Sequence, residues 1–270
     1  MTRPHCEMIN LGRAADRRAH MTEEMARADM SVTFHPAFDF TEHDEADILA
    51  RCKRDGPWGT FHTPNMAATL SHAEAWERFL ATDANHCLVM EDDIFISPDL
   101  GQWLDDLSWW PENADIVKLE RWRSKSTKVV MESPVATHRG RNLSRILSRH
   151  MGAAGYMLTR DAAQRLLAAQ PYDMVIDHML FNTNASKTAR VMNIFQVDPA
   201  MIIQGNEPAD SPFYMGERKR PTGMALAKQA LKRSYYEVAY PLSTIAKLAT
   251  GRAKLATVAF MNATTKEQQP

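Results

Sequence analysis

Short apolar runs that alternate with charged, helix-compatible segments make up most of this chain. The first run, Glu7 to Leu11, predicts a strand, and Gly12 predicts a turn into a charged helix over Ala14 to Arg27. A later run, Cys87 to Met90, is apolar without interruption, which is typical of a strand buried on both faces. Strands that alternate with helices in this way predict an α/β fold.

The same periodicities predict the remaining elements. Apolar residues at helical spacing predict a helix over Thr69 to Leu80, and Ser97 before Pro98 predicts a further helix with Ser97 as its cap. The other expected elements are strands at Val32–Phe34, Asp115–Leu119, Gly152–Leu158 and Val191–Val197, helices at Thr41–Ala50 and Arg160–Ala168, and a hairpin that joins Lys128–Met131 to Pro134–Thr137.

Composition narrows the function only in part. The 270 residues suit one large domain or one domain with an appendage, and the formal net charge of -1 gives no indication of nucleic-acid binding. The three cysteines form no CxxC pair, so we expect neither a disulfide framework nor a structural zinc site. The N-terminus lacks the apolar core of a signal peptide, and no run approaches the roughly 18 apolar residues of a membrane span. We therefore expect a cytoplasmic protein.

The charge distribution changes towards the C-terminus. Between Glu217 and Lys254 there are nine basic residues and two acidic ones. We place a boundary near Pro212, with a catalytic domain over residues 1–212 and a basic helical extension with a polar tail over residues 213–270.

Two amphipathic helices are expected in this extension, one on each side of Pro241. The first carries Met224, Ala227, Leu231 and Val238 near one face, and the second carries Lys247, Arg252 and Lys254. The pattern favours helices that lie on an anionic membrane surface, which would place the protein on the inner face of the membrane. The alternative is a helical pair that packs on the catalytic domain and shows its charges to water.

Three adjacent acids, Glu91, Asp92 and Asp93, follow directly after the buried run that ends at Met90. Three neighbouring carboxylates repel one another, whereas a divalent cation such as Mg²⁺ or Mn²⁺ binds hard carboxylate oxygens and leaves positions open for phosphates. Ligands of open α/β sheets also lie at the carboxyl ends of strands. The acids therefore indicate a metal site, and the alternative is an acidic turn that caps the next helix.

The other candidate residues flank this triplet in the sequence. Asn10, Leu11, Arg13 and Arg17 follow the first strand, where they either hold a nucleotide phosphate or form a solvated helix face. Ser71 and His72 lie near the expected start of the Thr69 to Leu80 helix, where they either contact an anionic ligand or act as surface and capping residues. Asp177 lies in a largely apolar segment, either as a functional acid or as a helix cap, and Gln204 follows a late apolar run.

Taken in order, these segments resemble glycosyltransferase family 25, the bacterial lipooligosaccharide glycosyltransferases. The resemblance covers residues 7–211. It rests on Ile9-Asn10-Leu11 with Arg13, Asp16 and Arg17, on Thr69 to Trp76 with its Ser-His pair, on Leu88 to Ile94, on Asp115 to Leu119, on Gly152 to Thr159, and on Asp177 and Gln204. The chain departs from the family at Asn65 to Ala68, where the family usually shows Gly-Glu-Ile-Gly-Cys in what we expect to be a loop that affects sugar or acceptor preference.

The resemblance implies a GT-A-like mixed sheet flanked by helices and an inverting transfer of a hexose, galactose or glucose, from a UDP-sugar. The acceptor would be a lipooligosaccharide or another surface glycan. It also implies a Mn²⁺ or Mg²⁺ ion at Asp93 with Glu91 and Asp92 nearby, and nucleotide contacts from the opening arginines. An inverting enzyme needs a base for the acceptor hydroxyl. Asp177 is the first candidate and Glu120 the second, and Asp177 could instead complete the metal shell.

Two other functions compete with this one. A protein of the same fold could bind at a membrane without catalysis, for which the altered Asn65 to Ala68 segment is a small argument. A metal-dependent phosphohydrolase could use the same acids. Turnover of UDP-sugars with and without an acceptor separates the three functions.

Overall fold

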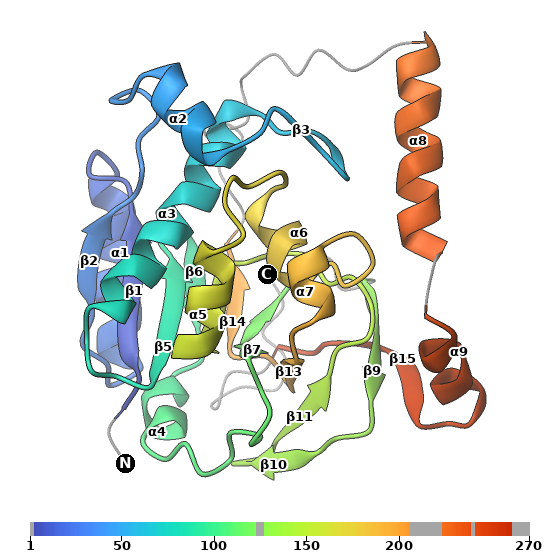
Figure 1. Ribbon diagram of the computed structural model, residues 1–270. Coiled ribbons are helices and arrows are strands. Elements are labelled where there is room, and N and C mark those ends of the chain that lie inside the picture. Colours follow the sequence, from blue (N-terminus) through green and yellow to red (C-terminus); the bar gives the residue numbers. More distant parts are fainter. Residues whose placement is uncertain (1–2, 123–126, 206–222, 239–240, 261–270) are drawn as a thin grey trace.

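A mixed sheet of eight strands forms the centre of the protein (Figure 1). The computed structural model describes residues 3–122, 127–205, 223–238 and 241–260. In spatial order the strands of the central sheet are β10 (Ala136–His138), β11 (Arg141–Arg145), β13 (Ile194–Asp198), β7 (Ile116–Lys118), β12 (Gly155–Thr159), β5 (His86–Glu91), β1 (His5–Asn10) and β2 (Thr33–Pro36).

Strand β5 lies between β1 and β12 in the central sheet. It runs parallel to β1, with Ile9 opposite Glu91, and antiparallel to β12, with Gly155 opposite Met90. The residues from Cys87 to Met90 are fully buried, as expected for a strand covered on both faces. The carboxyl ends of β1 and β5 therefore meet at one edge of the sheet, and the acids that follow Met90 lie there.

Helices cover both faces of the central sheet. One face packs against α3 (Thr63–Leu80), α5 (Arg160–Leu167) and α6 (Ile176–Phe181), and the other against α1 (Ala15–Arg27) and α4 (Leu100–Leu104). Trp76 and Phe79 of α3 are fully buried on the first face, and Met21 and Met25 of α1 on the second. The apolar stripe of each helix thus supplies one layer of core. The short helices α2 (Glu45–Arg51) and α7 (Lys187–Arg190) lie against α3 and α6 respectively.

Three smaller sheets complete the described part of the chain. Their strands are β6 (Ile94–Ile96), β14 (Ile202–Gln204) and β8 (Glu120–Arg121) in the first, β3 (Asp55–Gly56) and β4 (Gly59–Thr60) in the second, and β9 (Lys128–Glu132) and β15 (Ala253–Thr257) in the third. Helices α8 (Gly223–Val238) and α9 (Leu242–Ala249) belong to the C-terminal region. The mixed sheet flanked by helices confirms the predicted fold class.

Helix α3 begins earlier than expected. It starts at Thr63 and not at Thr69, with Pro64 in its first turn, where the missing N–H of proline costs nothing. Ser71 and His72 consequently lie in the middle of the helix, and the prediction that they sit at its N-terminus is wrong. The segment from Asn65 to Ala68 is likewise helical and not a loop.

Ser97 does not cap a helix, which corrects a second prediction. Helix α4 begins at Leu100, and its N-cap is Asp99. The backbone N–H of Ser97 donates to Met201 O at 2.8 Å, so tertiary pairing holds this segment in an extended conformation. Arg141 then binds both Ser97 Oγ, at 3.0 Å, and the Asp99 carboxylate.

The predicted hairpin between Lys128–Met131 and Pro134–Thr137 is also wrong. Both segments are strands, but β10 pairs with β11 and β9 pairs with β15. Arg139 and Gly140 have positive φ angles of 45° and 77°, the turn geometry that joins adjacent antiparallel strands.

The C-terminal region contains both expected helices and one element that was not expected. Lys254 lies in β15 and not in a helix, and Arg252 precedes that strand. The proposed domain boundary near Pro212 lies outside the described residues, as do Arg218, Lys219 and Arg220. Across the part of the chain that is described, no helix has the length and apolar character to traverse a bilayer.

Candidate functional site

Asp92 joins the ends of β1 and β5 to helix α1. Asn10 Nδ2 donates to Asp92 Oδ2 at 2.7 Å, and Arg17 Nη1 donates to Asp92 Oδ1 at 2.9 Å. Both contacts involve a carboxylate that is only 6% exposed. Asn10 and Arg17, two of the residues predicted for nucleotide binding, therefore converge on Asp92, and the two hydrogen bonds to its buried carboxylate fix their geometry.

Glu91 and Asp93 face a different partner from the one that Asp92 contacts. Gln204 Nε2 lies 3.0 Å from Glu91 Oε2 and 3.4 Å from Asp93 Oδ1. The backbone reinforces this contact, because Gly205 N donates to Asp93 O at 2.7 Å. The late glutamine is thus brought to the acids from a position more than 110 residues away along the chain.

His72 reaches Glu91 from helix α3 and also contacts Tyr156, which is itself bonded to Trp76. Trp76 Nε1 can only donate, so its 2.9 Å bond to Tyr156 Oη makes the hydroxyl an acceptor there. His72 Nδ1 lies 3.0 Å from the same hydroxyl. His72 Nε2 lies 3.2 Å from Glu91 Oε1, so the ring links Tyr156 to Glu91. Burial lowers the pKa of His72 to about 3, which agrees with a neutral ring.

Negative charge accumulates around Glu91. The pKa of Glu91 is raised to about 7, chiefly by burial and to a smaller extent by the nearby charges of Asp92 and Asp177. Asp177 lies half-buried in the first turn of α6, where its Oδ1 accepts from His178 N at 2.7 Å. Asp177 therefore lies close enough to Glu91 for their charges to interact. The sequence alone does not indicate this proximity.

Glu120 lies deeper than the other acids. Its carboxylate is fully buried, accepts from Ala154 N at 2.9 Å and pairs with Lys118 Nζ at 3.4 Å. Lys118 in turn donates to the carbonyl oxygens of Met151 and Gly152. Sequence reasoning overlooked Lys118, although a lysine within the apolar run from Ile116 to Leu119 is the kind of signal that identifies a buried cation.

Three predicted residues lie away from this cluster or have internal roles. Arg13 is half-exposed and pairs with Asp39. Ser71 Oγ donates to Ala67 O and accepts from Phe38 N, both at 2.9 Å, so it links α3 to the segment after β2. The carbonyl of Leu11 accepts from Ala14 N at 2.8 Å in the turn that follows β1.

The three consecutive acids do not form a common cage. Among the described residues, no three His, Cys, Asp or Glu side chains are grouped so that they could hold a metal ion. Glu91 and Asp93 nevertheless share Gln204 as a neighbour. A divalent ion at a nucleotide site commonly uses one or two carboxylates and completes its shell with phosphate oxygens and water. The donor set fits a site of that kind and not an all-protein metal site.

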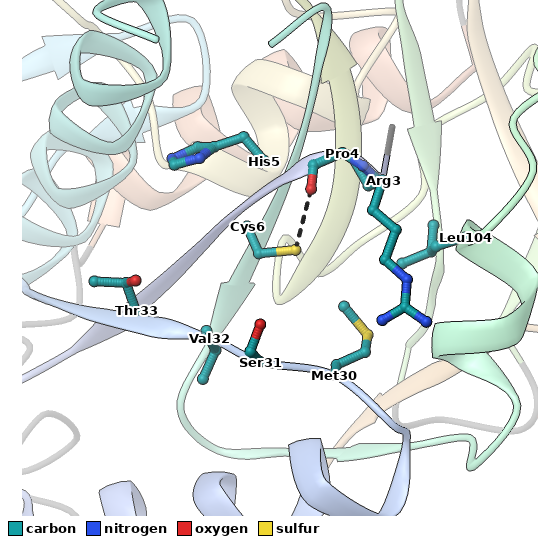
Figure 2. Close-up of a pocket in the computed structure, with 9 residues that line it drawn as sticks. All are labelled: Arg3, Pro4, His5, Cys6, Met30, Ser31, Val32, Thr33 and Leu104. Atoms are coloured by element: carbon teal, nitrogen blue, oxygen red, sulfur yellow. Dashed lines mark hydrogen bonds between the residues drawn. The ribbon is translucent and has the colours of Figure 1, made fainter. Parts of the chain in front are cut away.

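A pocket of about 280 Å³ lies elsewhere, at the opposite end of β1 (Figure 2). Its lining includes Arg3, His5 and Cys6 at the start of β1, together with Ser31 and Thr33 near β2. It contains none of the acids discussed above. Burial also raises the pKa of the Cys6 thiol to about 12, so this thiol is not activated as a nucleophile.

Comparison with known families decides the class of this protein. The family model of glycosyltransferase family 25 (LPS biosynthesis protein) matches residues 4–180. The chain belongs to glycosyltransferase family 25. The matched region contains Glu91 to Asp93 and Asp177, and it ends before Gln204. The resemblance seen in the sequence motifs is confirmed, and the protein is a glycosyltransferase.

Curated relatives of this transferase come from Neisseria and Haemophilus. The lacto-N-neotetraose biosynthesis glycosyltransferase LgtE of Neisseria gonorrhoeae is 28% identical over 207 residues, which cover 73% of this chain and 72% of the relative. LgtB of Neisseria meningitidis serogroup A is 29% identical over 209 residues, 73% of each chain. The lipooligosaccharide biosynthesis protein lic2B of Haemophilus influenzae is 21% identical over 207 residues, 73% of this chain and 74% of the relative.

Among solved structures, the transferase is similar to a glycosyltransferase involved in the glycosylation of the major capsid of PBCV-1. The TM-score is 0.37 at 10% identity, over 87% of this chain and all of the other. It is also similar to the inositol-1-phosphate CTP transferase from T. maritima, with a TM-score of 0.42 at 11% identity, over 89% of this chain and 99% of the other.

Proposed function

We propose that this transferase moves a hexose, galactose or glucose, from a UDP-sugar to a lipooligosaccharide or related surface glycan, with inversion at the transferred carbon and with a divalent metal. The family supports transfer from a nucleotide-sugar to a glycan. The observation that carries the finer proposal is the convergence of Glu91, Asp93, His72 and Gln204 at the carboxyl end of β5 in the central mixed sheet.

The strand-end acids supply the metal site in this proposal. Asp93 and Glu91 would hold Mn²⁺ or Mg²⁺, which would neutralise the charge that develops on the departing diphosphate. Asp92 has a supporting role, because Asn10 and Arg17 bind both of its oxygens. Arg17 also brings a guanidinium to this edge, where it can bind a phosphate oxygen of the donor.

Asp177 is the proposed general base. In a single displacement the acceptor oxygen bonds to the anomeric carbon as the bond to the diphosphate breaks, and the acceptor proton passes to a carboxylate. Asp177 is half-buried near Glu91, whereas Glu120 is enclosed by Lys118 and the backbone of Ala154. Access therefore favours Asp177 over Glu120.

We further propose that the C-terminal region holds the enzyme against an anionic membrane surface on the cytoplasmic side, where a lipid-linked acceptor would be reached. Leu242, Ile245 and Leu248 of α9 follow one another at intervals of three residues and are 84%, 51% and 39% exposed. Exposed Arg252 and Lys254 lie just beyond that helix. Apolar and basic groups together suit the interface of an anionic bilayer.

A transfer assay on the full chain tests the enzymatic proposal. Purified protein is incubated with UDP-galactose or UDP-glucose, Mn²⁺ or Mg²⁺, and delipidated lipooligosaccharide or simple glycosides as acceptors. We expect sugar transfer with one donor, loss of activity in excess EDTA, and an anomeric configuration in the product opposite to that of the donor. Hydrolysis of the UDP-sugar that does not depend on an acceptor would instead indicate a phosphohydrolase.

Asp93→Asn is the matching variant. It removes one carboxylate charge at nearly constant volume, and the packing of β5 does not use that side chain, so the variant should melt like the wild type. We expect its transfer rate to fall at least a hundredfold. Near-full activity of Asp93→Asn, or of the wild type in EDTA, would contradict the metal proposal.

A further inference from the structure

The β3–β4 hairpin brings an indole ring close to the proposed base. Trp58 lies in the turn of this hairpin, and the turn packs tightly, because a Cβ atom on Gly56 would lie only 1.6 Å from Asp173 O. Lys53 N also donates to Tyr172 O at 2.7 Å. These contacts anchor the hairpin to the segment that leads into α6, and in Figure 1 the strand β3 lies above α6 in the view.

Trp58 lies within a cluster that adjoins Asp177. Its ring centroid is 4.4 Å from that of His178, the residue after Asp177, with an interplanar angle of 36°. The Arg149 guanidinium lies 5.4 Å from the indole centroid. His178 is itself held by Asn182, whose Nδ2 lies 3.0 Å from His178 Nδ1. Trp58 and Arg149 are both half-buried, so each retains surface for another partner.

We propose that Trp58 and Arg149 form the subsite that binds the acceptor sugar. A pyranose ring has C–H groups on its faces and hydroxyl groups on its edges. The negative face of an indole attracts the C–H groups, and a guanidinium can donate several hydrogen bonds to the hydroxyls. The cluster adjoins the residue proposed to receive the acceptor proton, so this inference rests on the proposed function.

The position of Tyr236 links this subsite to the C-terminal region. Its ring centroid is 6.3 Å from that of Trp58, and it belongs to α8. The acceptor subsite thus lies beside the part of the chain that we propose to face the membrane. A lipid-linked acceptor would reach Trp58 from that side.

Acceptor kinetics test the subsite. Methyl β-D-glucoside, methyl β-D-galactoside and methyl N-acetyl-β-D-glucosaminide serve as probes at a fixed, saturating concentration of the donor. Trp58→Ala should raise the acceptor KM about tenfold, the size of effect expected when an aromatic contact is lost, and leave the donor KM unchanged. Trp58→Phe should restore part of the loss, and Arg149→Met should also raise the acceptor KM.

Two controls keep the outcomes distinct. Trp110→Ala removes an indole that packs on His86, away from the hairpin, and should leave both KM values unchanged. Saturation-transfer NMR with the same glycosides reports binding without turnover, so it decides the subsite even where no donor supports transfer. An unchanged acceptor KM with unchanged NMR binding in Trp58→Ala would overturn the inference, as would an equal rise in the donor KM.

Discussion

The chain bends at Asp92 and Asp93 as it leaves β5, and the three adjacent acids there have different partners. Asp92 faces Asn10 and Arg17, whereas Glu91 and Asp93 both face Gln204. A motif of three acids in sequence is therefore two separate features in space. One links β1 to α1 through Asp92, and the other is the Glu91–Asp93–Gln204 group to which we assign the cation in our proposal.

Replacing Asp177 by asparagine tests its role as a base. The amide keeps the size of the side chain and an oxygen that can accept from His178 N, but it cannot take a proton. Turnover should fall by a factor of ~10² to 10⁴, the usual cost of losing a general base. Steady-state kinetics with separate donor and acceptor titrations measures the effect, and the donor KM should change little.

The size of the change in the donor KM distinguishes a base from a metal ligand at Asp177. A large rise in the donor KM, together with a changed Mn²⁺ requirement, would place Asp177 in the metal shell. Glu120→Gln provides the comparison. Because Glu120 pairs with buried Lys118, its variant should lose thermal stability, a loss that we do not expect for Asp177→Asn.

We expect buried His150 to make the free energy of unfolding sensitive to acid. It is 2% exposed, and burial together with the charge of Lys118 holds its pKa well below its usual value. In the unfolded chain this histidine is protonated below about pH 6.5, whereas in the folded chain it stays neutral to a lower pH. Its contribution to the free energy of unfolding is therefore complete above about pH 6.5 and declines as the pH falls. The decline is at most about 1.4 kcal/mol per pH unit.

Comparison with His150→Gln isolates that contribution. Chemical denaturation at several pH values between 4.5 and 7.5 should show a shallower acid decline in the variant than in the wild type. His72, also buried with a lowered pKa, remains in both proteins and cancels in the comparison. Parallel pH profiles would show that His150 is protonated equally in the folded and unfolded states.

At the scale of elements, the pattern of apolar residues is enough to predict a strand where both of its faces are buried. The run from Cys87 to Met90 predicted a central strand because both faces of β5 are covered. The partner of a strand in a sheet was not predictable from the local pattern. Strand β9 pairs with β15, more than 100 residues later, and nothing in the local sequence of Lys128 to Met131 selects that partner over the nearby Pro134 segment.

The candidate site shows the same contrast between what local sequence indicates and what depends on long-range contacts. The sequence indicated Glu91, Asp93 and Asp177, because acids after or within apolar runs are conspicuous. It did not indicate Trp58 or Tyr156, because aromatic residues are common in any core or loop. Their roles depend on tertiary contacts, such as the bond from Tyr156 to His72, that no spacing encodes.

Gly152 tests how tightly Glu120 of β8 and the segment before β12 are packed together. It has a φ angle of 85°, and a Cβ atom there would lie 2.2 Å from Glu120 Oε1. Gly152→Ala should therefore lower the free energy of unfolding by about 2–4 kcal/mol, combining backbone strain with overpacking. Urea denaturation measures the change.

Gly140 provides the matched control. Its φ angle of 77° is similar, but a Cβ atom there would have nothing within 4 Å. Gly140→Ala should cost only the backbone term, about 1–2 kcal/mol. Equal losses for the two variants would show that the contact with Glu120 adds nothing and that this buried carboxylate can move aside.

At the scale of the whole molecule, the C-terminal region returns to the central part of the protein. Strand β15 pairs with β9 from Ala253 to Thr257, and Lys247 of α9 pairs with Glu132. Ala200 N donates to Ala259 O at 2.7 Å. Deleting the region would therefore remove a strand and destabilise the protein, so point substitutions on its surface are the cleaner way to test membrane binding.

The orientation of α9 is the reason to expect such binding. Thr244 is buried, at 4% exposure, whereas Leu242 and Ile245 face outward. A helix that only served a core would bury its apolar stripe and expose its threonine. Vesicle co-sedimentation should show binding to bilayers that contain phosphatidylglycerol, little binding to pure phosphatidylcholine, and a decline with salt, since each basic residue near an anionic surface contributes ~1 kcal/mol.

Replacing Leu242 and Ile245 together by serine should weaken that binding about tenfold or more, because each buried methylene contributes about 0.8 kcal/mol. The melting temperature should change little, since Leu242 is 84% and Ile245 51% exposed. Leu49→Ser, on the surface of α2, is the control for a generic loss of exposed apolar surface, and it should bind vesicles like the wild type. Activity on free glycosides should be unchanged in the double variant, while activity on lipid-linked acceptor in vesicles should fall. If the double variant and the wild type sediment equally with anionic vesicles, α9 is not the contact with the membrane.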